Sequence, residues 1–315
     1  KLLVRLASPL REGASAAVVV AAGVCAYHDT KFRQETRLKP RIRYYGAEPD
    51  QFAEGAGKLV EAGFDVIDIN FGCPVKKVLG RCRGGVHLGQ PAVALQIVEQ
   101  TRDIVPDHIP VTVKMWRGID DSPESRDNFF QILDGAFQLG VAAITVHGRT
   151  VEQRYVGASR WEFLKEVKEH AGERTILGSG DLFRAQDCLD MIAQTGVDGV
   201  TVARGAIGNP WIFAQARALA DGQSLPEPPS LFEQRDVLRE HFLLSQSLYG
   251  PERCGIVMRK FGIKYAGLHP DYSDVRAEFV KVRDQQGWEV VLNRWYGEDR
   301  PGCYPVDDMH GSQDA

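Results

Sequence analysis

Strand-like apolar runs alternate with amphipathic helical patterns through the first two thirds of the chain, and this alternation limits the possible folds more than any other feature. Strands are expected at residues 41–46, 64–70, 110–115, 142–147, 174–178 and 197–203. Helices are expected between them, at residues 49–61, 91–104, 125–139, 161–170 and 185–194. Apolar strands separated by helices predict right-handed βαβ units and a parallel sheet.

A further strand is expected at residues 16–21, where the sequence reads AAVVVA. The strand order shows no reversal of the kind that a doubly wound sheet requires, so we expect a (β/α)8 TIM-type barrel of about 250 residues. One strand is missing from the pattern, because residues 27–38 are polar and charged. The barrel is therefore expected to be either complete or short of one N-terminal strand–helix unit.

The pattern changes after residue 220. Residues 221–229 form a Pro-rich linker, and a helix over 231–248 is opened by Ser230, with Glu233 as its capping-box partner. Further helices are expected at 254–265, 275–286 and 288–295. We predict an α/β barrel over 1–220 (1–40 divergent), a linker over 221–229, a helical domain over 230–296 and a flexible tail over 297–315.

Composition excludes several classes of protein. The 315 residues carry a formal net charge of −4, so contact with nucleic acid requires a local basic patch. The six cysteines are scattered without a CxxC pair, which favours a reduced, cytoplasmic protein. The longest apolar run, residues 14–24, is too short to span a bilayer and lacks the features of a secretory signal, so no membrane contact is expected.

Polar side chains stand at the predicted carboxyl ends of several strands, where a parallel barrel places its active site. Cys73 lies between Gly72 and Pro74, in a rigid turn that would present the thiol as a nucleophile or general acid. Lys114 ends an apolar strand and would offer a fixed cation to an electron-rich cofactor oxygen, and His147 ends the next strand. The alternatives are an inert cysteine in a turn, a solvated lysine and a structural histidine.

Two glycine-containing turns follow the last two strands. The first is Ser179-Gly180-Asp181, and the second begins at Ala203-Arg204. Backbone N–H groups of such turns bind phosphate in many barrels, and Arg204 would add a charge-assisted bond. The alternative is a pair of tight βα turns without a ligand.

Basic residues gather in two places. The first group directly follows Cys73 and comprises Lys76, Lys77, Arg81 and Arg83. The second lies in the helical region and comprises Arg259, Lys260 and Lys264. Each could be an ordinary solvated surface, but two basic surfaces on different domains suit a large polyanion better than a small metabolite.

Four segments resemble the tRNA-dihydrouridine synthases, especially the bacterial B-type branch. They are residues 68–78 (DINFGCPVKKV) with Gly84 and Gly85, residues 145–157, residues 203–213 (ARGAIGNPWIF) and residues 258–261 (MRKF). The resemblance runs from about residue 41 to residue 296, with the motifs in the family's order and spacing.

The resemblance implies an FMN enzyme that uses NADPH to reduce the uracil 5,6 double bond in tRNA. Hydride would pass from FMN N5 to C6, and Cys73 would protonate C5. Cofactor binding is implied for Lys114, His147, Ser179, Gly180, Asp181, Ala203 and Arg204. Substrate binding is implied for Asn70, Lys76, Lys77, Arg149, Arg259 and Lys260. No metal and no protein partner are implied.

The resemblance is weakest at the start of the chain. Residues 21–25 (AAGVC) lack the Pro and Met of the family's first strand, Arg43 stands where a flavin-contacting Gln is usual, and Ser179 stands where Asn is common. Two alternatives follow. One is a catalytically impaired tRNA-binding relative that has lost part of the flavin site, and the other is a barrel flavoprotein acting on a free pyrimidine.

Overall fold

The computed structural model describes residues 17–18, 48–61, 63–64, 66–74, 79 and 84–305. The strand expected at 41–46, the polar stretch at 27–38 and the basic residues that follow Cys73, including Lys76 and Lys77, lie outside these ranges.

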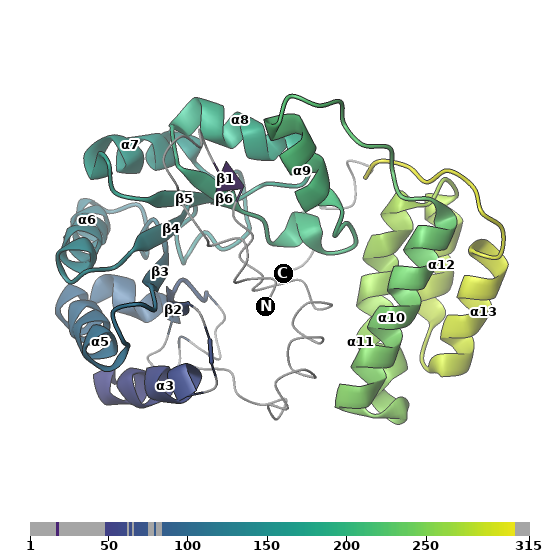
Figure 1. Ribbon diagram of the computed structural model, residues 1–315, viewed down its shortest axis with the longest axis horizontal. Coiled ribbons are helices and arrows are strands. Elements are labelled where there is room, and N and C mark those ends of the chain that lie inside the picture. The colour runs from purple at the N-terminus through teal and green to yellow at the C-terminus, as the bar shows by residue number, and fades with distance from the viewer. Residues whose placement is uncertain are drawn as a thin grey trace.

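A six-stranded parallel sheet forms the centre of the larger part of the molecule, with the order β1-β6-β5-β4-β3-β2 (Figure 1). Its strands are β1 (Ala17–Val18), β2 (Ile67–Phe71), β3 (Val111–Trp116), β4 (Ala143–His147), β5 (Ile176–Ser179) and β6 (Gly199–Thr201). The first strand pairs with the last, Ala17 opposite Gly199. Pairing of the first strand with the last in a parallel sheet is the strand order of a TIM-type barrel. This order confirms the predicted fold class.

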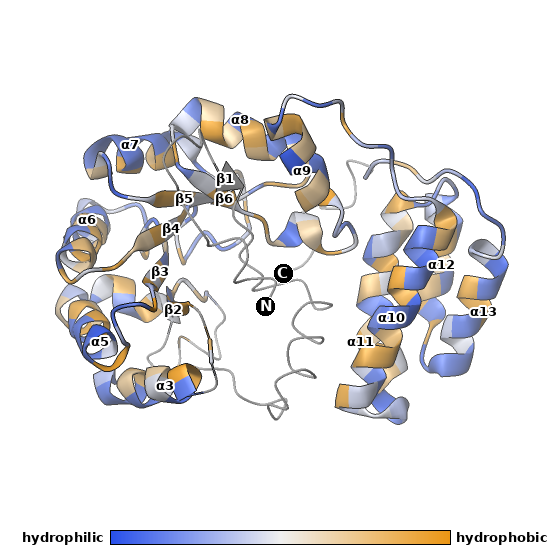
Figure 2. Ribbon diagram, in the orientation of Figure 1, coloured by the Kyte–Doolittle hydropathy of each residue, from blue (hydrophilic) through white to orange (hydrophobic). Residues whose placement is uncertain are grey.

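Helices surround the sheet on its outer side (Figure 1). They are α3 (Pro49–Glu61), α5 (Pro91–Ile104), α6 (Pro123–Gln138), α7 (Trp161–Ala171), α8 (Ala185–Thr195) and α9 (Ile212–Ala220), with the short 3-10 turns η1 (Gly84–Gly89) and η2 (Arg204–Ala206). Hydrophobic and hydrophilic residues alternate along each helix (Figure 2), and the apolar ones join the outward side chains of the strands in one core, for example Ile69, Val113 and Ile144. The sequence analysis did not include α9.

Four further helices pack around a second core (Figure 1): α10 (Leu231–Tyr249), α11 (Pro251–Tyr265), α12 (Tyr272–Lys281) and α13 (Gln285–Trp295), with η3 (Ala266–Leu268) before α12. The predicted capping box opens α10, because the Ser230 hydroxyl accepts from Glu233 N and the Glu233 carboxylate accepts from Ser230 N. The two helices expected at 275–286 and 288–295 are present, but each begins three residues earlier and the first ends at Lys281. Asp284 caps a new helix by accepting from Gly287 N at 2.8 Å, so the chain turns between α12 and α13.

The segment after α13 is bound to the helical part as far as residue 305, where a flexible tail was expected. Arg300 O accepts from Leu231 N at 2.9 Å, and Cys303 N donates to Leu268 O at 2.8 Å. The Tyr304 hydroxyl donates to Pro226 O at 3.0 Å, which ties this segment to the linker. Residues 306–315 lie outside the described ranges.

The two cores meet at the turn between η2 and α9. Ile207 and Trp211 pack against the second core, and the Trp211 ring meets the Tyr265 ring edge-on at 6.3 Å. A side chain at Gly208 would lie 2.5 Å from the backbone of Lys264, so glycine permits this close approach. None of the helices in the described ranges is long and apolar enough to cross a membrane.

Candidate active site

The carboxyl ends of five neighbouring strands bring polar side chains to one end of the barrel. The register places Asn70 opposite Lys114, and in the next layer it places Trp116, His147, Ser179 and Thr201 in a row from β3 to β6. Since side chains alternate between the two faces of a strand, Asn70 and Lys114 share the inner face with this row.

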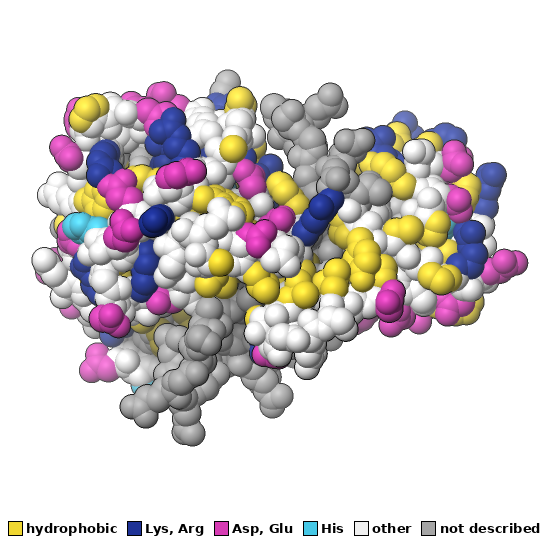
Figure 3. All heavy atoms as spheres, turned by 90° about the horizontal axis from the view of Figure 1, so that it is seen from above, with side chains coloured by type: hydrophobic (Ala, Val, Ile, Leu, Met, Phe, Trp, Pro, Cys, Tyr) yellow, Lys and Arg dark blue, Asp and Glu magenta, His cyan; other side chains and the backbone are white. Residues whose placement is uncertain are grey.

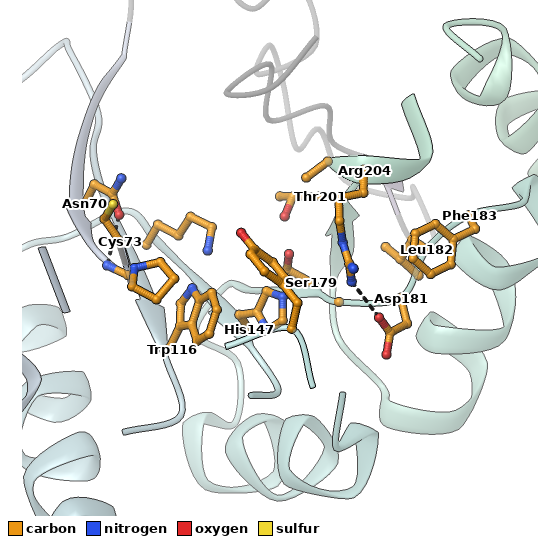
Figure 4. A pocket seen from close by; sticks show the side chains of 16 residues that line it. Asn70, Cys73, Trp116, His147, Ser179, Asp181, Leu182, Phe183, Thr201 and Arg204 are labelled. Atoms are coloured by element: carbon orange, nitrogen blue, oxygen red, sulfur yellow. Dashed lines mark hydrogen bonds and ion pairs between the residues drawn. The ribbon is translucent and has the colours of Figure 1, made fainter. Parts of the chain in front are cut away.

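These side chains line a cavity of about 260 Å³ (Figure 4). Its walls are formed by Asn70, Gly72, Cys73, Pro74, Lys114, Trp116, His147, Tyr155, Ser179, Gly180, Asp181, Leu182, Phe183, Thr201, Ala203 and Arg204. The predicted thiol, amine and imidazole and both glycine-containing turns therefore surround a single opening, although they lie far apart in the sequence.

Cys73 is half-buried in a turn that the backbone holds in place. Asn70 Oδ1 accepts from Gly72 N at 2.9 Å, and Cys73 O accepts from Gly85 N at 3.2 Å. A Cβ on Gly72 would lie 2.6 Å from the Trp116 ring, so glycine lets the turn pack directly on the indole. The thiol is thus presented at one wall of the cavity (Figure 4).

Lys114 is half-buried at the same wall. Its ammonium nitrogen lies near Gly72, 3.5 Å from the place where a Cβ of that residue would stand. Desolvation lowers the pKa of Lys114 to about 8, and the negative charges of Asp68 and Cys73 act in the opposite direction. Lys114 is therefore a cation whose charge depends on its anionic neighbours.

His147 is buried and is held as a neutral ring. Its imidazole stacks on Trp116 with centroids 4.5 Å apart and planes 17° apart. Burial, followed by the charges of Lys114, Arg149 and Arg204, lowers its pKa well below the ordinary value. Because Nδ1 accepts from Arg149 N at 3.2 Å, the hydrogen-bond network assigns the ring proton to Nε2, and His147 acts as a hydrogen-bond donor.

Asp181 joins two arginines at the opposite wall of the cavity. Its carboxylate accepts from Arg149 at 2.7 and 2.8 Å, from Arg204 at 2.9 Å and from Ser159 N at 2.7 Å. Figure 4 shows the Asp181 carboxylate turned toward Arg204. The charge of the Asp181 carboxylate is thus neutralised by Arg149 and Arg204. Its role toward an anionic ligand is to hold the Arg204 guanidinium in place.

The two glycine-containing turns are in direct contact. A Cβ on Gly205 would lie 2.1 Å from Leu182 O, so only glycine allows the chain after β6 to touch the chain after β5. Arg204 lies over the rings of Tyr155 and Phe183, at 4.7 and 5.0 Å. The Arg204 guanidinium is therefore held by cation–π contacts on its faces and by Asp181 at its edge.

The other predicted substrate-binding residues lie elsewhere. Arg149 is 3% exposed and does not line the cavity, since Gly157 O and Asp181 hold its guanidinium. Arg259 and Lys260 lie on α11, where Lys260 is exposed and its ammonium lies 4.8 Å from the centre of the Phe261 ring.

Trp116, Tyr155, Phe183 and Thr201 line the cavity and were not predicted as site residues. Trp116 and Thr201 carried a usable signal, because each stands on the inner face at the end of a strand, as Lys114 and His147 do. Tyr155 and Phe183 come from loops, and their rings reach the cavity through contacts with Arg204 that strand periodicity does not reveal.

Comparison with known proteins identifies the family. The family described as dihydrouridine synthase (Dus) matches residues 16–294. The chain belongs to the dihydrouridine synthase family. The predictions of an enzyme of this family and of a resemblance to its bacterial B-type branch are confirmed by this match and by the relatives.

Individual relatives cover most of the chain. A probable tRNA-dihydrouridine synthase of Mycobacterium tuberculosis (strain CDC 1551 / Oshkosh) is 34% identical over 273 residues, which is 86% of this chain and 69% of the relative. The tRNA-dihydrouridine synthase B of Xanthomonas axonopodis pv. citri is 35% identical over 256 residues, 81% of this chain and 76% of the relative.

Among solved structures, histamine dehydrogenase from Rhizobium sp. 4-9 aligns with a TM-score of 0.43 and 14% identity, covering 62% of this chain and 30% of that one. This likeness is too slight to support a conclusion about function.

Proposed function

We propose that this protein reduces specific uridines of tRNA to 5,6-dihydrouridine, with FMN as cofactor and NADPH as reductant. The observation that carries the proposal is the convergence of Cys73, Lys114, His147 and the two glycine-containing turns on one cavity at the carboxyl end of the barrel. Family membership supports the reaction class, because the relatives described above are named for dihydrouridine synthesis in tRNA.

The donors and rings around the cavity fit a flavin. Trp116, His147 and Tyr155 give it aromatic walls, and Lys114 and His147 Nε2 are donors suited to the polar edge of the flavin ring. The backbone at Gly180 and Ala203, together with Arg204, suits a phosphate. When bound, the flavin supplies the hydride that adds to C6 of the uracil ring.

Cys73 then acts as the general acid. Hydride addition at C6 leaves carbanion character at C5, and the Sγ–H proton passes to C5 as the electron pair of the S–H bond returns to sulfur. The resulting thiolate is stabilised by the Lys114 ammonium, whose charge interacts with Cys73. Asn70, whose Oδ1 accepts from Gly72 N, would orient the base beside the thiol through its side-chain NH2 group.

The substrate must present an unstacked base to the cavity, because the reacting atoms inside an RNA stack are out of reach. Arg259 and Lys260 on α11 are suited to hold the RNA backbone during this step. The described cysteines 73, 188, 254 and 303 are free thiols. With a tRNA substrate, they favour the cytoplasm as the site of action.

The alternative of a catalytically impaired tRNA-binding relative was based on residues before position 48, which lie outside the described ranges. No described residue favours it. Action on a free pyrimidine is the less favoured alternative, since it leaves the helical part without a role.

The test uses purified protein with FMN, NADPH and tRNA made without modification. We expect a flavin absorbance band near ~450 nm on the protein and dihydrouridine in the tRNA. Cys73→Ala should keep the band and its bleaching by NADPH but lose at least about 100-fold in the rate of dihydrouridine formation, the contribution typical of a general acid. Colourless protein that takes up no FMN would exclude the proposal, and an unchanged rate in Cys73→Ala would exclude the acid role.

A further inference from the structure

An acidic side chain lies inside the barrel, one layer below the candidate active site. Ile67, Ile69 and Phe71 of β2 are buried in the core with the outer helices, so Asp68 and Asn70 share the opposite, inner face. Asn70 lines the cavity, and Asp68 stands two residues before it on the same strand. TIM barrels usually fill this layer with packed apolar side chains, whereas Asp68 is a carboxylate that is exposed in the described part of the chain.

Asp68 is held in place by the neighbouring strand. The register places it opposite Thr112, and the Thr112 hydroxyl donates to Asp68 Oδ1 at 2.7 Å. The same register places Asn70 opposite Lys114. Asp68 is therefore the diagonal neighbour of Lys114 on the inner face of the sheet.

The groups that face Lys114 come from three directions. Asp68 lies on β2 below it, the Cys73 thiol follows the same strand above it, and His147 on β4 is influenced by its charge. Asp181, on the far wall of the cavity, is occupied by Arg149 and Arg204. Among the described residues, Asp68 is thus the carboxylate positioned to act on Lys114.

The charges of the two groups support one another. The Asp68 side chain is exposed in the described part of the chain, and desolvation by nearby protein atoms raises its pKa to about 6, against the opposing effects of Thr112 and Lys114. The negative charge of Asp68 in turn raises the pKa of Lys114, which desolvation brings down to about 8. Because the pKa of Lys114 lies only about one unit above neutral pH, removing the negative charge of Asp68 should let Lys114 lose its proton near neutral pH.

We propose that Asp68 is a positioning residue of the active site, and that its carboxylate keeps the Lys114 ammonium protonated beside the reacting thiol. The proposal deepens the proposed function and rests on it for the role of Lys114 in stabilising the thiolate. The Asp68–Lys114 coupling itself can be measured in protein without flavin or tRNA.

The experiment measures the reactivity of Lys114 with acetic anhydride as a function of pH, with the labelled peptide quantified by mass spectrometry. Only the free amine reacts, so the midpoint reports the pKa of Lys114. Asp68→Asn keeps the shape and the Thr112 contact but removes the charge. We expect its midpoint to fall by about one pH unit or more, the shift typical of losing a close opposite charge.

Asp198→Asn is the matched control. Asp198 is likewise a hydrogen-bonded carboxylate, 2.8 Å from Lys168, but it accepts from Ile176 N at the amino end of β5, away from the cavity. Its removal should cost stability without moving the Lys114 midpoint. An Asp68→Asn midpoint that stays with the wild type and this control would overturn the proposal.

A second variant covers the case in which Asp68→Asn does not fold. Thr112→Val removes the hydrogen bond that favours ionised Asp68, so Asp68 should hold its proton to a higher pH. We expect several-fold more labelling of Lys114 below pH 7 and unchanged labelling at pH 9. Equal labelling at both pH values would contradict the coupling. If the protein binds no flavin but Asp68→Asn still lowers the Lys114 midpoint, the proposed function is wrong and the Asp68–Lys114 coupling stands.

In the active enzyme, Asp68→Asn should shift the alkaline limb of the pH profile for dihydrouridine formation to lower pH. Asp68→Glu, which restores a carboxylate, should recover part of the displacement. A lower rate with an unmoved pH profile would indicate a merely structural role and would contradict the inference.

Discussion

At the scale of single residues, the site depends on which groups are charged at neutral pH. His147 lies between Trp116 and a set of cations, and its environment favours the neutral ring. In the unfolded chain the same ring takes up a proton near its ordinary pKa. Folding therefore costs more as the solution becomes more acidic, and the stability tied to neutral His147 is present above about pH 6.5 and is lost as the pH falls through that value.

This sign gives a prediction. Between pH 7.5 and pH 5.5 the wild type should lose about 1 kcal/mol more free energy of unfolding than His147→Asn, which cannot take up the proton. Urea denaturation at the two pH values measures both losses. Other histidines with lowered pKa, such as His269, are present in both proteins and cancel. Equal losses in the two proteins would show that His147 is not held neutral.

Cavity-lining residues that stand on strands were predictable, because strand ends in a parallel barrel share one rim. Lys114 and His147 were found in this way, and Cys73 was found from its turn. The partners of Asp181 were not predictable. Its φ of +58° and its bonds to Arg149 and Arg204 depend on loops that meet only in the folded chain, 32 and 23 residues apart in sequence. A glycine-containing turn indicates an anion site but does not show which side chain faces the anion.

At the scale of elements, the described helices and strands of the barrel other than α9 followed from periodicity, and their order followed from the alternation. α3 and α5 have the expected bounds, and β4 differs by one residue at its start. The division between α12 and α13 was expected, but it was placed after residue 286, because the apolar periodicity continues through Asp284, the side chain that caps α13. The segments before α3 carried the weakest pattern, and they also lie outside the described ranges.

The contact between the last two turns of the barrel should be sensitive to a single methyl group. Gly205→Ala would place a Cβ against Leu182 O, so we expect a loss of roughly 1–3 kcal/mol in the free energy of unfolding and weaker FMN binding. Urea titration and flavin fluorescence measure the two effects. Gly57→Ala in α3 is the control: its Cβ would make an ordinary 3.6 Å contact, and it should be neutral or stabilising by up to about 1 kcal/mol. Equal behaviour of the two variants would show that the turns can separate freely.

At the scale of the whole molecule, charges of both signs are interspersed over the face shown in Figure 3, in keeping with the small net charge. The described residues on that face form no broad basic surface. Arg259 and Lys260 on α11 are the described basic residues that the sequence analysis selected for the proposed tRNA contact.

Replacing these two residues by alanine should weaken tRNA binding, and the slope of log affinity against log salt should become shallower by about one for each phosphate that the protein no longer neutralises. The flavin spectrum should not change, because neither residue lines the cavity. Lys165→Ala on α7, an exposed lysine 4.0 Å from Glu169, is the matched control and should leave the slope unchanged. An unaltered slope in the double variant would place the RNA-binding surface elsewhere.

The segment that follows α13 has a mechanical consequence. Through Arg300, Cys303 and Tyr304 it fastens the start of α10, η3 and the connection at Pro226 to one another. The linker over 221–229 is therefore held against the segment that follows α13. A tRNA bound to the helical part would then meet the barrel in one fixed orientation. That orientation would depend on a segment that contributes no group to the reaction.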